Sequence, residues 1–320
     1  MTATPRHRPV LLERVVELLA PGLARPGAVC VDATVGLGGH AEAILERCPG
    51  VRLIGLDRDG QALALAADRL ARFGDRVTLV RTVFDRLPEV LAEHGVTGVQ
   101  GLLFDLGLSS LQIDDPARGF SYRHDVTLDM RMSGPDEPGP TAADVINTAS
   151  QAELARLLRD NADEPFAQRI AAAIVTERAR EPFSGSARLV ATVERAIPAR
   201  ARAQRGHPAK RTFQALRMAV NHEPEALAAV LPAALAALAV GGRLVVLSYH
   251  SGEDRLVKRT LARAARDDAP PGLVLVPEHL AARFRLLTDR AVRPGETEVA
   301  GNPRAAQARL RAVERIKEAA

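Results

Sequence analysis

Three aspartates in the first third of the chain each follow a short apolar run, and they are the residues best placed for chemistry. Asp32 follows the run 28–31, Asp57 ends the stretch LIGLD, and Asp105 ends the run that begins at Val99. A carboxylate at such a position can accept two hydrogen bonds from the ribose diol of an adenosine cofactor. Since open α/β sheets bind ligands at the carboxyl ends of their strands, these acids predict a cofactor site at that edge.

A glycine-rich turn, DATVGLGGH, follows the first apolar run and carries Gly36, Gly38 and Gly39. A dinucleotide fingerprint requires G-x-G-x-x-G, and the third glycine of that pattern is missing here. An S-adenosylmethionine site needs no phosphate cradle; it needs an acid near the first strand end, small residues beside the amino-acid end of the cofactor, and a contact to adenine. Asp32 and the glycines supply the first two. Phe84 could pack against adenine or belong to the core. Together these signals favour S-adenosylmethionine.

The elements that must position these residues alternate between strand and helix. Apolar runs predict strands at 28–33, 52–56, 77–83 and 99–105, with helices at 40–47, 61–73 and 88–93 between them. Such alternation predicts βαβ units and a parallel sheet. A fifth strand is expected at 242–250, after an Ala-rich helix starting near Pro224 in which Pro232 should produce a kink or a break.

Between the fourth and fifth strands lie about 130 residues, whereas a crossover needs only a dozen or somewhat more. Ser150 to Glu153 form a capping box before an apolar helical stripe, and Ser186 is expected to cap a later helix. We therefore predict an α/β core with an inserted all-helical domain. The expected bounds are 1–110 for the first part of the core, 111–208 for the insert, with a role in substrate recognition, and 209–320 for the second part of the core.

The charge is unevenly distributed, although 43 basic and 39 acidic residues give a net charge of only +4. The stretch 197–222 has no acid, and it is either a solvated face or a surface that meets phosphate. Its basic residues are Arg200, Arg202, Arg205, Lys210, Arg211 and Arg217.

Cysteine usage and apolar patterning bear on location. The two cysteines form no C-x-x-C pair, the His, Cys and Asp residues show no metal-ligand spacing, and no apolar run reaches the roughly 18 residues that a membrane span needs. A cytoplasmic protein that needs no metal is expected.

Eight motifs occur in an order that resembles a known family: HRPVLL, DATVGLGGH, LIGLDRD, FDLGLSS, DDPARGFSY, LDMRM, RTFQALRMAVN and SYHSGEDRLVK. They are similar to those of the bacterial small-subunit ribosomal RNA (cytosine-N4)-methyltransferase family, and the likeness spans nearly the whole chain. It departs at Val126 and Thr127, where the family usually has Gly-Pro, at Gly252, where a Leu is usual, and in the stretch DEPFAQRIA.

The resemblance implies a Rossmann-like, S-adenosylmethionine-dependent methyltransferase core with a helical insert. It implies methylation of the exocyclic amine of one cytosine in the decoding region of 16S rRNA, on naked RNA or within the small subunit; a homodimer remains open. The cofactor residues that it implies are Gly38, Gly39, His40, Asp57, Phe84, Asp105 and Gln112.

The chemistry itself needs acceptors for the N–H groups of the cytosine amine, whose lone pair is delocalised into the ring. Asp105, Ser109 and Ser110 are candidates, and His250 is an alternative base; the serines could instead cap a turn, and His250 could bond to backbone. Phe120 and Tyr122 could stack on an unstacked base or pack in the core. The basic run is the expected RNA-backbone surface.

Two other classes compete with this interpretation. A dehydrogenase would need the complete dinucleotide fingerprint, which the chain lacks. A non-catalytic ribosome-assembly factor could keep the fold without the chemistry, and the intact cofactor motif argues only weakly against it.

Overall fold

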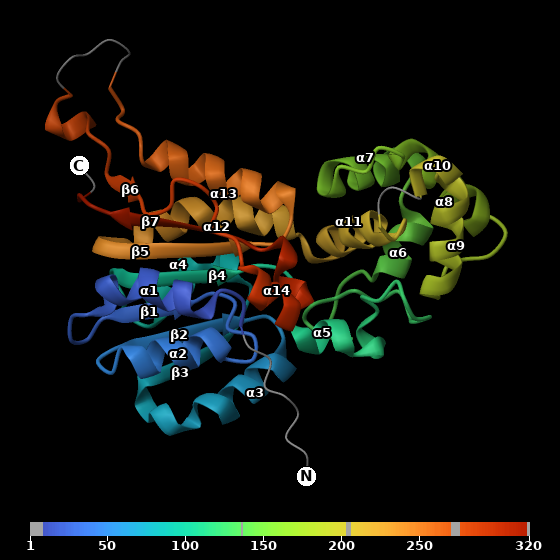
Figure 1. Cartoon of the computed structure of the whole chain (residues 1–320). Coiled ribbons are helices and arrows are strands. Elements are labelled where there is room, and N and C mark those ends of the chain that lie inside the picture. Colours follow the sequence, from blue (N-terminus) through green and yellow to red (C-terminus); the bar gives the residue numbers. More distant parts are fainter. Residues whose placement is uncertain (1–8, 136, 203–205, 270–275, 319–320) are drawn as a thin grey trace. The chain divides into compact units, whose positions relative to one another are not determined.

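The computed structural model describes residues 9–135, 137–202, 206–269 and 276–318. The chain forms two compact units, which Figure 1 shows in colours that follow the sequence. The first unit joins Met1–Gly107 with Ala226–Ala320, and the second is Leu108–Glu225. The named strands all belong to the first unit, so the two units differ in class as well as in sequence position.

A seven-stranded sheet forms the first unit, in the order β3-β2-β1-β4-β5-β7-β6. β1 to β5 are parallel neighbours, whereas β7 is antiparallel to both β5 and β6. The α/β prediction is confirmed, and five of the strands stand where the apolar runs predicted them. The bounds are β1 Val29–Asp32, β2 Arg52–Asp57, β3 Val77–Arg81, β4 Val99–Asp105, β5 Leu238–Ser248, β6 Phe284–Leu286 and β7 Arg309–Arg315.

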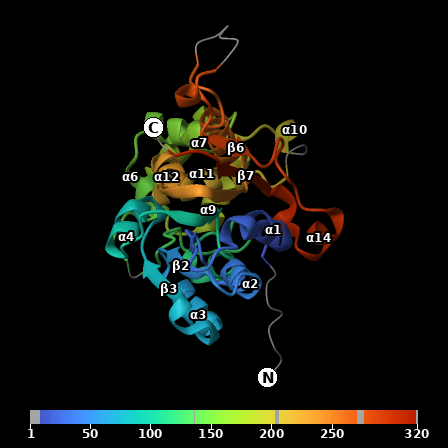
Figure 2. The same ribbon diagram turned by 90° about the vertical axis from the view of Figure 1, so that its left-hand side faces the viewer.

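Helices cover both faces of the sheet because successive strand residues point to opposite sides. α1 (Leu12–Leu23) and α2 (Gly39–Arg47) pack on the face that includes Leu103 and Leu247. α4 (Leu87–Glu93), α12 (Glu223–Ala237) and α13 (Ser251–Ala264) pack on the face that includes Phe104. Figure 2 shows α1 and α2 on one side of the sheet and α4 on the other. α3 (Gly60–Leu70) follows β2, and α14 (Glu296–Gly301) precedes β7.

Pro232 does not divide α12, which is a single helix with the proline inside it. Of the two predicted effects, a kink or a break, the break is therefore wrong and the kink stays a prediction. Pro232 itself is exposed, while Leu231 and Ala234 beside it are fully buried against the sheet. Packing of these neighbours compensates for the roughly 3 kcal/mol that an interior proline costs a helix.

The second unit is helical, with its own apolar core. It contains α5 (Ser110–Asp114), α6 (Ala142–Thr148), α7 (Gln151–Ala162), α8 (Ala167–Arg178), α9 (Ser186–Ala196), α10 (Ala199–Arg202) and α11 (Lys210–Asn221). Its last residue is Glu225 and not 208, because α11 buries Phe213 and Leu216 among these helices. Within the described ranges, no helix is long and apolar enough to cross a membrane.

Two N-terminal helix caps were predicted in this unit; one is confirmed and the other is wrong. The capping box of α7 is confirmed: Glu153 N donates to Ser150 Oγ (3.2 Å), and Ser150 N donates to Glu153 Oε2 (2.8 Å). Ser186 does not cap α9, whose N-cap is Gly185. Instead the buried Ser186 hydroxyl accepts a hydrogen bond from Val126 N (2.9 Å). This bond connects the start of α9 to the loop around Val126, 60 residues earlier in the chain.

Candidate active site

The three predicted aspartates end three neighbouring strands. β2, β1 and β4 are adjacent and parallel, and their last residues are Asp57, Asp32 and Asp105. Because parallel strands run in one direction, their ends lie at one edge of the sheet, which is where such sheets bind ligands. The structure therefore brings these acids together at that edge.

Asp32 is the most deeply buried of the three, with only 1% of its surface exposed. Burial raises the pKa of Asp32 to about 8, because desolvation disfavours the charged form. A hydrogen bond from Thr34 N to Asp32 Oδ1 (3.2 Å) lowers the pKa, and the charges of Asp105 and Asp57 raise it further. A cation bound at this edge would favour the ionised form of Asp32.

The glycine turn is tied to Asp57. Gly36 N donates to Asp57 Oδ2 (2.9 Å) and Asp59 N donates to Asp57 Oδ1 (2.9 Å). Burial raises the pKa of Asp57, and these two bonds act against that rise. Gly36 and Gly38 have φ of 50° and 77°, a region that glycine enters without strain. Since the Gly36 N–H already serves a carboxylate, the turn is unlike a phosphate cradle.

The chain segment before α1 packs against the glycine turn. A Cβ added to Gly39 would lie 2.4 Å from Pro9 Cγ, so only glycine allows this approach. The buried His40 has Nε2 3.0 Å from Val10 O, and because a carbonyl only accepts, Nε2 is the donor. His40 Nδ1 lies 3.5 Å from Asp105 Oδ2, which joins this segment to the end of β4.

Asp105 is held from two directions. Its backbone N donates to Thr34 Oγ1 (2.6 Å), and its Oδ1 accepts from the hydroxyl of Tyr249 (2.7 Å). Tyr249 is the residue that the sequence analysis missed, although it lies in the motif SYHSGEDRLVK. The available signal was its place just past the fifth strand, since β5 is the parallel neighbour of β4.

Phe84 follows β3, as expected for an adenine contact. Its ring meets Phe104 edge to face, with ring centroids 5.8 Å apart, and it is half-buried against the core under the sheet. The ring therefore has a core contact on one side, and the adenine contact stays a prediction.

Ser109 and Gln112 bond to each other at the start of α5, in the second unit. Ser109 N donates to Gln112 Oε1 (3.0 Å), Gln112 N donates to Ser109 Oγ (3.3 Å), and the Gln112 amide donates to Met132 O (3.1 Å). Ser110 is the first residue of that helix. The geometry gives Ser109 and Gln112 a capping role, and their roles toward amine and cofactor stay predictions.

His250 caps α13 in a similar way. Glu253 N donates to His250 Nδ1 (3.3 Å), so the ring proton of the neutral imidazole is on Nε2. Nε2 lies 3.1 Å from Glu253 Oε1 but is not aligned for a hydrogen bond. A role for His250 as a base requires this capping bond to open.

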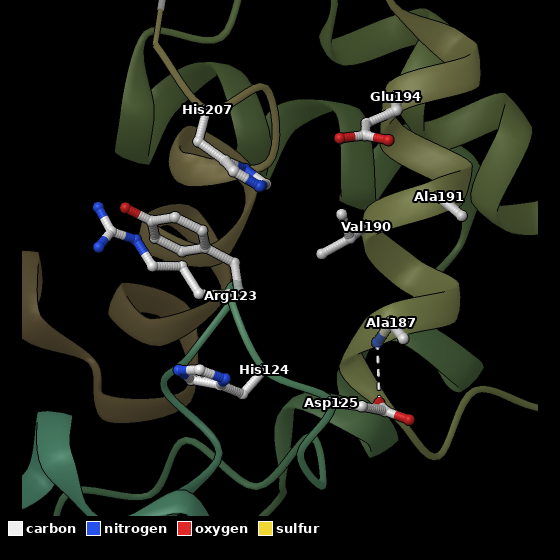
Figure 3. Close-up of a pocket in the computed structure, with 9 residues that line it drawn as sticks. Arg123, His124, Asp125, Ala187, Val190, Ala191, Glu194 and His207 are labelled. Carbon is white, nitrogen blue, oxygen red and sulfur yellow. Dashed lines mark hydrogen bonds between the residues drawn. The ribbon is translucent and has the colours of Figure 1, made fainter.

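A pocket of about 520 Å³ lies within the second unit (Figure 3). In Figure 3, Arg123, His124 and Asp125 come from one loop, which lies opposite Ala187, Val190, Ala191 and Glu194 of α9. Tyr122 lines the pocket, with its ring 4.6 Å from His207 and 5.8 Å from Phe213. Phe120, by contrast, is only 9% exposed and packs in the core of the unit. Of the two predicted stacking residues, Tyr122 lines this pocket and Phe120 does not.

The structure describes part of the predicted basic surface. Arg200 and Arg202 are exposed on α10, and Lys210 is exposed at the start of α11. Arg211 donates to Asp163 O (2.7 Å), and Arg217 pairs with Glu223 through two hydrogen bonds of 2.8 Å. Arg205 lies outside the described residues. Arg211 is itself exposed, so four cations of the described part of this stretch are exposed: Arg200, Arg202, Lys210 and Arg211. Among the described residues, no group of three His, Cys, Asp or Glu could hold a metal ion.

The model of the MraW methylase family matches residues 4–316. The chain is a member of the MraW methylase family. A curated relative from Acidothermus cellulolyticus, named ribosomal RNA small subunit methyltransferase H, is 59% identical over 98% of this chain and 94% of its own length. A relative of the same name from Nocardioides sp. is 57% identical over 99% and 98%.

Among solved structures, an rRNA methylase from Streptococcus thermophilus has a TM-score of 0.44 at 12% identity, covering 99% of both chains. That likeness is distant, and the assignment depends on the family model and the curated relatives. Membership of the MraW methylase family confirms the predicted enzyme class, a methyltransferase, and S-adenosylmethionine as its cofactor. It excludes the dehydrogenase alternative.

Proposed function

We propose that this chain transfers a methyl group from S-adenosylmethionine to N4 of one cytosine in the decoding region of 16S rRNA. The observation that carries the proposal is the set of three carboxylates at the ends of β1, β2 and β4, beside a glycine turn whose Gly36 N–H serves Asp57. Carboxylates suit a ligand that carries a sulfonium and an ammonium, and they repel a pyrophosphate. The relatives named as small-subunit rRNA methyltransferases support the choice of RNA.

The residues have the following proposed roles toward the cofactor. Asp57 accepts from the ribose hydroxyls, since each carboxylate oxygen can accept a second bond. Asp32 and Asp105 face the positively charged end. Phe84 packs on the adenine. The backbone of the turn approaches the amino-acid end, together with His40, and Gln112 is a further cofactor-binding candidate. When bound, the cofactor supplies an electrophilic methyl group.

The cytosine amine needs acceptors that let its nitrogen develop a lone pair as the methyl approaches. Asp105 is the principal candidate, because a carboxylate can accept an N–H bond and also take the proton. Ser109, four residues further along the chain, and Ser110 are secondary candidates. Positioning of amine and methyl supplies much of the rate.

RNA binding is assigned to the second unit. Tyr122 beside the pocket offers a ring on which an unstacked base can stack. Arg200, Arg202 and Lys210 are exposed cations that can bind phosphates. Arg205 and Arg211 complete the proposed RNA-binding set. The substrate is the rRNA within the small ribosomal subunit, in the cytoplasm.

The experiment combines the purified chain with labelled S-adenosylmethionine and small subunits from a strain that lacks the gene. The wild type should form N4-methylcytidine in 16S rRNA, and Asp105→Asn should reduce the rate at least roughly 100-fold. A methyl group on another base, or none in RNA, would overturn the proposal.

A further inference from the structure

Tyr249 occupies the place where two strand ends meet. β4 and β5 pair in parallel, with Asp105 opposite Leu247, and Tyr249 follows Leu247 by two residues. Leu106 N also donates to Leu247 O (3.1 Å), so the pairing continues past the aspartate. A residue two positions beyond Leu247 is therefore well placed to reach the side chain that ends the neighbouring strand.

The ring and the backbone of Tyr249 are both fixed. Its ring lies over Gly107, where an added Cβ would be 3.4 Å from Cδ2, and packs on the apolar face below α1. Gly107 has φ of 102°, a backbone conformation that favours glycine. Tyr249 N donates to Glu253 Oε2 (2.8 Å), which belongs to the capping box of α13. The phenol therefore reaches Asp105 from a rigid support.

The bond between Tyr249 Oη and Asp105 Oδ1, at 2.7 Å, has the length of an O–H donor facing a carboxylate. Burial raises the pKa of Tyr249 well above its usual value, and the charge of Asp105 raises it further, so the phenol stays a donor across the physiological range. A donated hydrogen bond favours the ionised form of the carboxylate. Without it, Asp105 would face neighbouring acids with less to stabilise its charge.

We propose that Tyr249 is a positioning residue that fixes the orientation and the ionised state of the Asp105 carboxylate. The inference rests on the proposed function, since it acts through the same site. Tyr249 leaves Asp105 as the group that meets cofactor and amine, and it contacts neither itself.

Other ionisable groups near Tyr249 and Asp105 also influence how this site responds to pH. Asp105 is faced by His40 and by Asp32 at the end of the adjacent strand β1, and Tyr249 is faced by acids of α13 and α14. The acids of α13 and α14 are Glu253 and Glu298, and Asp57 on β2 acts on Asp32. They are unchanged by removal of one hydroxyl, so a change in pH dependence on removal reports the bond between Tyr249 and Asp105.

Tyr249→Phe tests the proposal, because it keeps the ring and removes only the donor. The affinity for S-adenosylmethionine or the turnover should fall about tenfold, the equivalent of one pKa unit. The acidic limb of the kcat/KM profile against pH should move to higher pH, while the unfolding midpoint changes little. A purely structural role would lower the midpoint and leave the pH profile where it is.

A double-mutant cycle with Asp105→Asn, read out as cofactor affinity by calorimetry, separates the outcomes. If Tyr249 acts through Asp105, the second change adds little to the first. Full additivity, or a Tyr249→Phe variant with the affinity, turnover and pH profile of an active wild type, would overturn this proposal alone. A wild type that binds no S-adenosylmethionine would overturn the proposed function as well.

Discussion

At the scale of single residues, the site is a cluster of three acids that the fold brings close together. Asp32, Asp57 and Asp105 end adjacent strands, and burial raises the pKa values of the first two. The apolar runs predicted their places because each acid directly follows a buried strand. The sequence places Tyr249 just past the fifth strand, but the contact of its phenol with Asp105 depends on the pairing of β4 with β5 across more than a hundred residues, which the sequence does not show.

Asp32 should make the protein less stable as the pH rises from about 4 to 8. Its pKa is about 8 in the folded chain and near 4 when unfolded, so the folded state binds more protons in this window. The stabilisation is complete below pH 4 and is lost toward pH 8. Asp32→Asn cannot ionise, so the stability of the wild type relative to this variant should fall by up to about 1.4 kcal/mol per pH unit.

Urea unfolding of both proteins at pH 5, 6, 7 and 8 measures this difference. The other acids are common to both proteins, which makes the difference specific to Asp32. A difference that stays constant with pH would show that Asp32 is ionised throughout.

At the scale of elements, the two units are organised by different means. The sheet follows from apolar runs that the sequence shows directly. The strands β6 and β7 were not predicted, because β6 has only three residues and β7, RLRAVER, has charged residues between its apolar ones. In the second unit, hydrogen bonds from polar side chains connect loops to helices. Asn221 at the end of α11 accepts from Met132 N (2.8 Å) and donates to Met130 O (2.7 Å), which joins the motifs LDMRM and RTFQALRMAVN.

Asn221→Ala should destabilise the second unit by about 2 kcal/mol or more. The amide is 3% exposed, and its removal leaves Met132 N and Met130 O buried without this partner. Met130 has φ of 61°, a strained conformation for a methionine, which the amide helps to hold. Urea unfolding measures the change, and Gln214→Ala on the same helix is the control, with an expected effect under about 0.5 kcal/mol. Equal effects of the two changes would contradict this role.

At the scale of the whole molecule, the chain combines a sheet unit, to which we assign the cofactor, with a helical unit that carries exposed cations. The division into two units was expected from the long gap between the fourth and fifth strands. The assignment of α11 to the helical unit was not, because the amphipathic pattern of a helix does not tell which core its apolar face joins.

Neutralising Arg200, Arg202 and Lys210 together should weaken binding to small-subunit RNA and lower the log–log salt slope by roughly 2–3. For each phosphate contact that is lost, one counterion stays on the RNA that binding would otherwise release. The matched control neutralises Arg25, Arg47 and Arg52, which are exposed near the amino ends of β1 and β2. If both triple variants keep the wild-type slope, the basic stretch is only a solvated face.

Mass spectrometry of 16S rRNA from a strain that lacks this gene tests the central claim most directly. The account predicts that one cytosine in the decoding region loses a methyl group from N4. It further predicts that the wild-type gene restores that group and that a gene carrying Asp105→Asn does not. A 16S rRNA with every methylated cytosine retained in the deletion strain would contradict it.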